Sequence, residues 1–133
     1  MIEFSYKVEI GRKGEKVLRP VADVYMRSQK GQWIELHPYI DSGADVTLIP
    51  LSFGRLLGLD ALKDQSERIG GISGSISVVY LQNKLRIGSY ELTARIGWAL
   101  VEKVPPLLGR ADVFDAFDVL FRQKEGKIQF THR

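Results

Sequence analysis

A strict alternation of apolar and polar or small residues in the second half of the chain constrains its fold more than any other feature. The apolar positions are Tyr90, Leu92, Ala94, Ile96, Trp98 and Leu100. Successive side chains of a β-strand point to opposite faces, so a period of two indicates a half-buried strand and disfavours a helix. The pattern therefore predicts a long, half-buried strand over residues 90–100.

Shorter alternations predict further strands over Ile2–Ile10, Val17–Arg27, Trp33–Ile40 and Gly126–Phe130, with a hairpin connection at Ser28–Gly31. Helical signals are few. Residues 112–120 are predicted to form a short helix, because Val113, Phe114, Phe117 and Leu120 are spaced for one and Asp112 is placed to cap it. Leu51–Leu57 is predicted to form a further turn or two of helix. Residues 1–133 are predicted to be one mostly β domain.

Composition narrows the range of functions. Hydrophobic residues make up 44% and charged residues 26%, a balance typical of globular domains. No cysteine is present, which excludes disulfides, thiolate metal sites and cysteine nucleophiles and suits a reducing cytoplasm, where we expect the protein. The net charge of +3 is a weak signal for nucleic-acid binding. The sequence shows neither a signal peptide nor an apolar run long enough for a membrane span.

The residues Asp41-Ser42-Gly43-Ala44 interrupt two apolar stretches. This pattern places a carboxylate at the end of a buried strand, and Gly43 lets the backbone turn tightly beside it. An isolated Asp-Ser-Gly is also an ordinary turn sequence, and that alternative is decided only by what surrounds the motif. The whole segment, residues 39–48, resembles the active-site loop of the retropepsin-like aspartic proteases, in which two hydrophobic residues precede Asp-Ser/Thr-Gly-Ala. Tyr39 departs mildly from the usual aliphatic residue.

Two later segments extend the resemblance. The glycine-rich run Gly70-Gly71-Ile72-Ser73-Gly74 predicts a hairpin tip, which is either a plain surface hairpin or, by resemblance, the flap that closes over a bound peptide. The run Leu107-Leu108-Gly109-Arg110 is similar to the second hydrophobic-hydrophobic-glycine loop of the family. In many retropepsins an arginine at the position of Arg110 pairs with an acidic residue at the position of Asp45. The alternative is a simple junction between a loop and a helix.

The resemblance implies a closed, barrel-like β fold and an endopeptidase that is active as a homodimer on polypeptide substrates, with no metal or organic cofactor. It assigns Asp41 as the catalytic carboxylate and Ser42, Gly43 and Ala44 as support for its loop. A dimer is implied because the chain carries a single Asp-Ser-Gly, whereas the chemistry needs two carboxylates.

Alternatives from other classes stay open. One is a catalytically silent peptide-binding or dimerisation module with the same fold, and a weaker one is a nucleic-acid-associated protein, motivated by the pI of 9.2. His37 and His132 are the only histidines, and neither has a cluster of ligand residues beside it in sequence, so no metal site is predicted. We predict no nucleic-acid or membrane partner.

Overall fold

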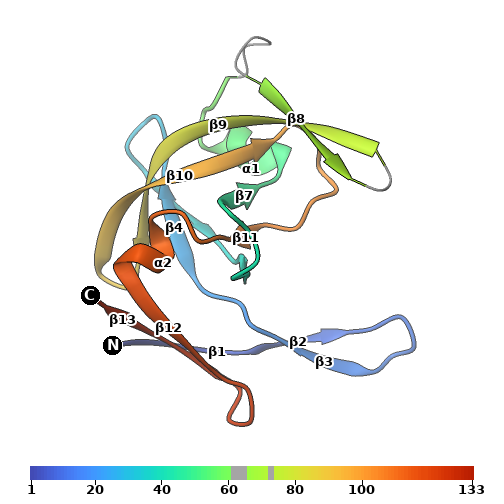
Figure 1. Cartoon of the computed structure of the whole chain (residues 1–133), viewed down its shortest axis with the longest axis vertical. Helices are drawn as coiled ribbons and strands as arrows, with labels where there is room; N and C mark the ends of the chain where they lie inside the picture. Colours follow the sequence, from blue (N-terminus) through green and yellow to red (C-terminus); the bar gives the residue numbers. More distant parts are fainter. Residues whose placement is uncertain (61–65, 72–73) are drawn as a thin grey trace.

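The computed structural model describes residues 1–60, 66–71 and 74–133, and most of them lie in strands (Figure 1). The mostly β prediction is confirmed. Three sheets are present in the described part of the chain: a large central sheet, a three-stranded sheet that contains both ends of the chain, and a two-stranded hairpin.

The central sheet carries most of the core. Its strands run in the order β5 (Trp33–Leu36), β4 (Val24–Arg27), β9 (Gly74–Ile87), β10 (Tyr90–Ala99), β7 (Thr47–Ile49), β11 (Leu107–Leu108) and β6 (Tyr39–Ile40), with β8 (Ser66–Gly71) also paired to β9. The sheet curls strongly, and a bridge from Tyr39 of β6 to Val21 brings the far edge back toward the segment that enters β4. The closed barrel expected from the sequence is therefore confirmed only in part, as a half-barrel (Figure 1).

The alternation that predicted a strand over residues 90–100 corresponds to β10. Ala94, Ile96 and Trp98 are buried, while Glu91, Thr93 and Arg95 are exposed. β10 pairs along its full length with β9 in antiparallel register, from Tyr90 opposite Ile87 to Ala99 opposite Val78. Toward the end of β10 both faces are covered, because Gly97 and Ala99 are buried as well.

The terminal sheet has the order β1 (Ile2–Ser5), β13 (Lys127–His132), β12 (Phe117–Arg122). The Phe130 ring packs edge to face on the rings of Phe4 and Phe117, each with centroids 5.7 Å apart, which joins the three strands. Phe117 also packs edge to face on Tyr90 of β10 at 5.4 Å, which ties this sheet to the central one. The long strand predicted over Ile2–Ile10 is divided at Tyr6 into β1 and β2. The side chain of Tyr6 is buried, and its N–H donates to the carbonyl of Gly126 at 2.8 Å.

The helix predicted over residues 112–120 was wrong in its extent. Only Val113–Ala116 is helical (α2), and from Phe117 the chain continues as β12, where Phe117 and Val119 face the core and Asp118 faces outward. Asp112 does not cap the helix with its side chain. Its backbone has a φ of +66°, and its carboxylate accepts a hydrogen bond from the N–H of Arg95 at 2.8 Å. The pairing of β12 with β13 outweighs the helical spacing of four apolar residues.

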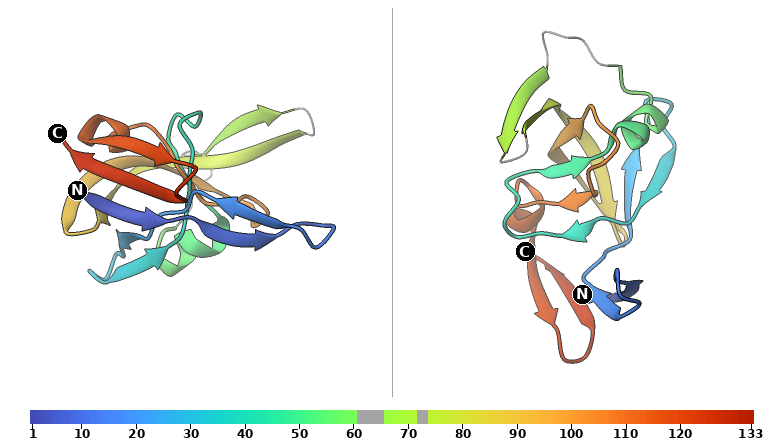
Figure 2. Two further views of the ribbon diagram at one scale, coloured as in Figure 1. Left: turned by 90° about the horizontal axis from the view of Figure 1, so that it is seen from below. Right: turned by 90° about the vertical axis from the view of Figure 1, so that its right-hand side faces the viewer.

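Two hairpins project to the same side of the molecule (Figures 1 and 2). One consists of β2 (Lys7–Ile10) and β3 (Lys16–Arg19), and the other of β8 and the first part of β9. The strand predicted over Val17–Arg27 is thus two strands, β3 and β4, and the strand predicted over Trp33–Ile40 is likewise divided into β5 and β6. The Ser28–Gly31 connection is confirmed, with Gly31 at a φ of +82°.

The short helix α1 (Leu51–Leu56) is fixed against β10 by one tryptophan. The indole N–H of Trp98 donates to the carbonyl of Leu51 at 3.2 Å, and a Cβ on Gly54 would lie 2.0 Å from that indole nitrogen. No side chain of the helix caps its first turn. Instead the carboxylate of Glu102 accepts hydrogen bonds from the hydroxyl and N–H of Ser52, at 2.6 and 2.9 Å, which lowers the pKa of Glu102.

Gly54→Ala is expected to destabilise the protein although alanine favours helices. Overpacking against the Trp98 ring costs about 1–3 kcal/mol, whereas the helical preference returns only about 0.5–1 kcal/mol. Urea unfolding followed by tryptophan fluorescence measures the net loss. Gly11→Ala is the matched control, because its added methyl meets only the carboxylate end of the Glu15 side chain. Equal stability of the two variants would contradict the packing described.

Candidate active site

The Asp41 loop, residues 41–46, arches over a strand that comes from far along the chain. β11 is inserted between β6 and β7: Leu107 pairs with Tyr39 on one side and with Leu48 on the other. Adjacent strands lie about 4.8 Å apart, so the loop spans roughly twice that distance. The N–H of Asp41 donates to the carbonyl of Leu108 at 3.0 Å, which anchors the first residue of the loop to the strand beneath it.

The carboxylate of Asp41 is held from its own loop. The N–H of Gly43 donates to Oδ1 of Asp41 at 2.9 Å, and the N–H of Ala44 donates to the carbonyl of Asp41 at 3.2 Å. Asp41 is half-buried, while Ser42 and Gly43 are exposed. A Cβ on Gly43 would lie 3.2 Å from Oδ1, which is a tight contact. The turn therefore fixes the orientation of the carboxylate and leaves it open to solvent.

Gly109, which follows β11, lies directly against the backbone of the Asp41 loop. A Cβ at this residue would lie 2.3 Å from the carbonyl carbon and oxygen of Val46, and backbone atoms there have no room to move aside. The N–H of Gly109 donates to the buried hydroxyl of Thr47 at 3.1 Å. Just beyond, the N–H groups of Arg110 and Ala111 donate to two carbonyls of the Asp41 loop, each at 2.9 Å. Glycine is thus required at position 109 by packing.

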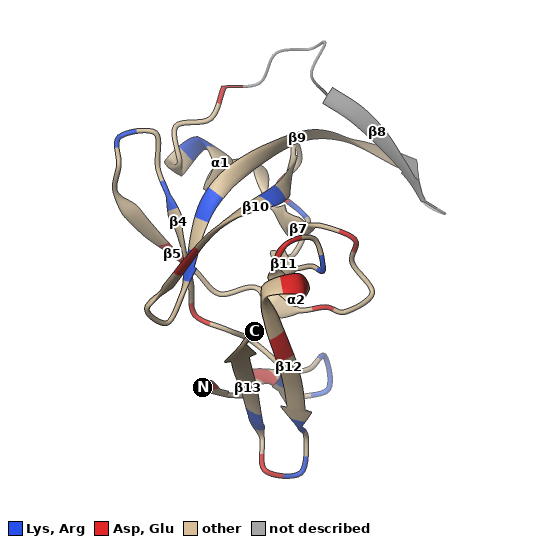
Figure 3. Ribbon diagram, turned by 60° about the vertical axis from the view of Figure 1, so that its left-hand side comes forward, with Lys and Arg blue, Asp and Glu red and all other residues tan. Residues whose placement is uncertain are grey.

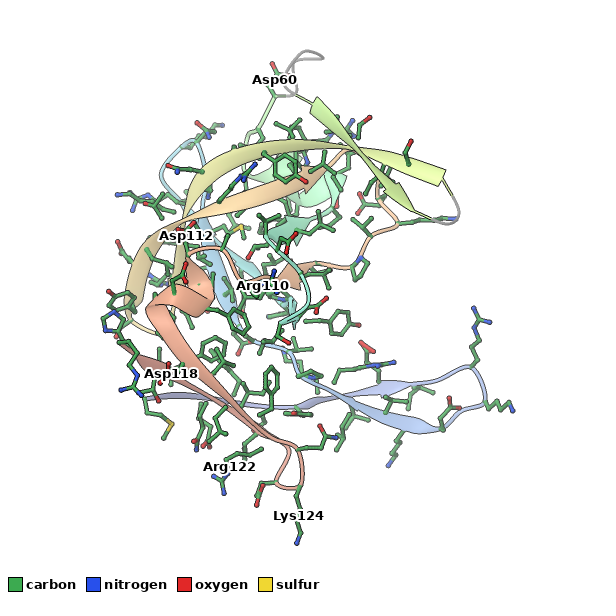
Figure 4. All side chains as sticks on the ribbon, in the orientation of Figure 1. Asp60, Arg110, Asp112, Asp118, Arg122 and Lys124 are labelled. Atoms are coloured by element: carbon green, nitrogen blue, oxygen red, sulfur yellow. The ribbon has the colours of Figure 1, made fainter. Side chains whose placement is uncertain are left out.

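The structure brings Arg110 and Asp45 together. Arg110 lies beside the Asp41 loop (Figure 4), where its guanidinium forms an ion pair with the Asp45 carboxylate and donates to the carbonyl of Ser42 at 3.3 Å. The side chains are 53% and 86% exposed. Solvent screens a pair of this kind, so it orients the loop more than it stabilises the fold.

A hollow of about 340 Å³ is lined by Glu9, Arg19, Tyr39 and Pro105. Tyr39 precedes Asp41 by two residues, and its hydroxyl donates a hydrogen bond to the Glu9 carboxylate, which raises the pKa of Tyr39. Arg19 in turn forms an ion pair with Glu9 at 3.3 Å. Sequence reasoning missed Glu9 and Arg19, because they lie on the β2–β3 hairpin and reach the site only through the fold.

The glycine-rich hairpin is described in part. Gly70 and Gly71 end β8, Gly74 begins β9, and Gly71 pairs with Gly74. Ile72 and Ser73 lie outside the described residues. The hairpin expected from the sequence is therefore present in its two strands, on the side of the molecule toward which the β2–β3 hairpin also projects.

Figure 3 marks both basic and acidic residues along the part of the ribbon that it colours. None of the described helices combines the length and the apolar composition needed to cross a membrane.

Comparison with known proteins identifies the fold. No protein-family model matches the sequence, and no curated protein sequence matches it. The chain is similar in structure to a retropepsin-like aspartic protease from Rickettsia conorii, with a TM-score of 0.69 and 16% identity over 97% of this chain and 99% of that one. It is also similar to EIAV protease in complex with the inhibitor HBY-793, with a TM-score of 0.53 and 22% identity over 69% and 82% of the two chains.

The chain therefore has a retropepsin-like fold, and the resemblance inferred from the sequence motifs is confirmed at the level of the fold. At these identities the similarity establishes the arrangement of the strands. The chemistry open to Asp41 and its neighbours depends on their own geometry.

Arg110→Ala is expected to lower the free energy of unfolding by about 1 kcal/mol or less, since the ion pair is exposed. The loss should still exceed that of Arg122→Ala, whose pair with Glu125 at 3.7 Å joins residues only three apart. Arg110 by contrast joins two loops that are 65 residues apart in sequence. Urea denaturation of both variants measures the difference, and equal losses would show that the Asp45 pair does not hold the loops together.

Proposed function

We propose that this protein is an aspartic endopeptidase whose catalytic group is Asp41. The observation that carries the proposal is the Asp41 carboxylate itself, oriented by the N–H of Gly43 and open to solvent at the end of a strand in a retropepsin-like fold. A module that only bound peptides would have no need of a carboxylate held in this way.

The active species we propose is a homodimer. Peptide hydrolysis by carboxylates needs one group to accept a proton and another to donate one. The chain supplies one such aspartate, and the corresponding inserted strand β11 carries Leu107 and Leu108 instead of a second one. A two-fold axis beside the loop brings two copies of Asp41 together. Carboxylates so close do not both ionise easily, so the pair holds one proton and titrates as a unit.

The reaction follows from that shared proton. The ionised carboxylate removes a proton from a water molecule placed between the two groups, and the water oxygen attacks the peptide carbonyl carbon. The protonated carboxyl donates its proton to the carbonyl oxygen, which gives a neutral tetrahedral intermediate. When the C–N bond breaks, the leaving nitrogen takes up the proton of the aspartate pair, and one hydroxyl of the intermediate gives its proton back to the pair as it becomes the carbonyl of the carboxylic acid product. The pair is left with one proton as at the start. No metal or organic cofactor enters these steps.

The substrate we propose is an extended polypeptide bound between the Asp41 loop and the β8–β9 hairpin. Two features support this. The hairpin projects on the side where the β2–β3 hairpin also lies, and the hollow lined by Tyr39, two residues before Asp41 in sequence, offers a place for a substrate side chain. In this proposal the segment 70–74 acts as a flap, Ser42 braces the partner loop, and Ala44 closes the turn.

The alternative function is a catalytically silent binding or dimerisation module, which no observation in the structure specifically favours. We further propose that the 133 residues work as one domain. A cytoplasmic location stays a prediction from the absence of cysteine.

Asp41→Asn should abolish peptide hydrolysis and leave the fold intact. The amide retains an oxygen that accepts from the Gly43 N–H but exchanges no proton, and loss of acid–base catalysis costs about 10²–10⁴ in rate. Cleavage of a mixed peptide library by wild type and variant, with circular dichroism of each, tests this. Asp115→Asn, at an exposed position on α2, is the matched control. Rates within a few-fold of wild type for Asp41→Asn would refute the assignment.

Dilution tests the dimer. Specific activity should fall steeply once the protein concentration drops below the dimer dissociation constant, because a monomer retains only one of the two carboxylates. Sedimentation velocity over the same concentrations reports the assembly state. Full specific activity from a species that sediments as a monomer would overturn the paired mechanism.

A further inference from the structure

Three potential metal ligands meet on an exposed face beside β4 and β5: Glu35 lies on β5, His37 follows β5 directly, and Asp23 directly precedes β4. The register of β4 against β5 places Val24 opposite Leu36, and a bridge places Val21 opposite Tyr39. Between these pairs Asp23 stands directly opposite His37. Glu35 precedes His37 by two residues and therefore shares its face. The fold thus supplies the ligand neighbours that His37 lacks in the linear sequence.

The three potential ligand atoms lie close together, and His37 is hydrogen-bonded to Glu35. His37 Nε2 lies 3.0 Å from Oε1 of Glu35 and 3.5 Å from Oδ1 of Asp23, and all three ligand atoms lie within 4.8 Å of one another. Zinc bonds of about 2.0–2.1 Å in a tetrahedron separate neighbouring ligands by about 3.4 Å. Two of the three separations are thus within about half an ångström of that value. Their side chains are about half exposed, so an ion has direct access from solution.

A cation from the protein itself already lies at this cluster. The ammonium of Lys7, on β2, contacts Oδ1 of Asp23 at 3.0 Å, the same oxygen that faces His37. Lys7 comes from a different sheet and is 16 residues from Asp23, so its position is not imposed by local sequence. The cluster of two carboxylates and one ammonium retains one unit of negative charge. This face therefore already holds one positive charge. Removal of the Lys7 ammonium would leave the two carboxylates with a stronger attraction for another cation.

We propose that Asp23, Glu35 and His37 form a binding site for a divalent transition-metal cation of the Zn²⁺ type. One imidazole nitrogen and two carboxylate oxygens suit such an ion better than Mg²⁺ or Ca²⁺, which prefer oxygen ligands alone. A fourth position stays open for water, as in other zinc sites with three protein ligands. Among the residues that the structure describes, this is the one group in which three such ligand atoms converge.

The place of the site in the fold gives the bound ion a consequence. The N–H of Ala22 donates to the carbonyl of Pro38, and the N–H of Ile40 donates to the carbonyl of Pro20. An ion held by Asp23 and His37 links these two segments through side chains as well, directly before β6 and Asp41. It acts as a structural clip on the base of the candidate active site and takes no part in the reaction. The proposal therefore stands whether or not the protein hydrolyses peptides.

Calorimetric titration of chelator-treated protein with ZnCl₂ tests the site. Wild type should bind one Zn²⁺ per chain. His37→Gln and Glu35→Gln should each weaken binding by more than about tenfold, the loss seen when even outer-shell partners of a metal are removed. His132→Gln is the matched control, since His132 is the other histidine and lies against the Tyr90 ring at 3.9 Å. Failure of wild type to bind, or equal weakening by His37→Gln and His132→Gln, would overturn the proposal.

Two further variants distinguish zinc binding at this cluster from binding elsewhere and from a general loss of stability. Lys7→Gln removes the competing ammonium, so it should tighten zinc binding, an effect opposite to that of general destabilisation; weaker binding would contradict the arrangement. Asp41→Asn should bind zinc as wild type does, whereas loss of binding would place the ion on the catalytic carboxylates instead. Imidazole NMR signals add a direct readout, because with two histidines only the His37 signals should shift on addition of ZnCl₂.

Discussion

The close approach of two backbones at Gly109 is the constraint on which the rest of the site depends. β11 lies between β6 and β7 only because Gly109 has no side chain to meet the carbonyl of Val46. Once β11 is inserted, the carbonyl of Leu108 accepts a hydrogen bond from the N–H of Asp41, and the Asp41 loop must arch above the strand. The turn at Gly43 then aims the carboxylate. The position of the Asp41 carboxylate therefore depends on the lack of a side chain at Gly109, 68 residues away in sequence.

Electrostatic contacts around this site orient groups rather than stabilise the protein. The pairs of Arg110 with Asp45 and of Arg19 with Glu9 are both exposed to solvent, where each contributes little free energy. Their value lies in geometry: one joins the two loops, and the other fixes Glu9 against the Tyr39 hydroxyl. The stability of the fold comes instead from the apolar surface that is buried along β9 and β10.

The sequence predicted local patterns well and contacts across the fold poorly. Period-two alternation identified β10, and the resemblance of the segments around Asp41, the glycines and Leu107–Gly109 to retropepsin motifs implied the fold that the structural comparisons confirm. Phe117–Leu120 was assigned to a helix because its spacing fits a helical face, and only pairing with β13 decides for a strand. The neighbours of His37 were missed for a similar reason: Glu35 shares its face at a spacing of two, but Asp23 arrives through strand register.

β9 belongs at once to the core and to the projecting hairpin. Its 14 residues form one unbroken strand of about 46 Å at 3.3 Å per residue. Side chains alternate along the whole of it, so the faces of the hairpin are set by the register of Val78–Ile87 in the core. Inserting or deleting one residue anywhere in β9 would exchange inner and outer faces on one side of the change. Substitutions, or changes at its tip, can alter this hairpin, but which of its residues face inward is determined by the register of β9 in the core.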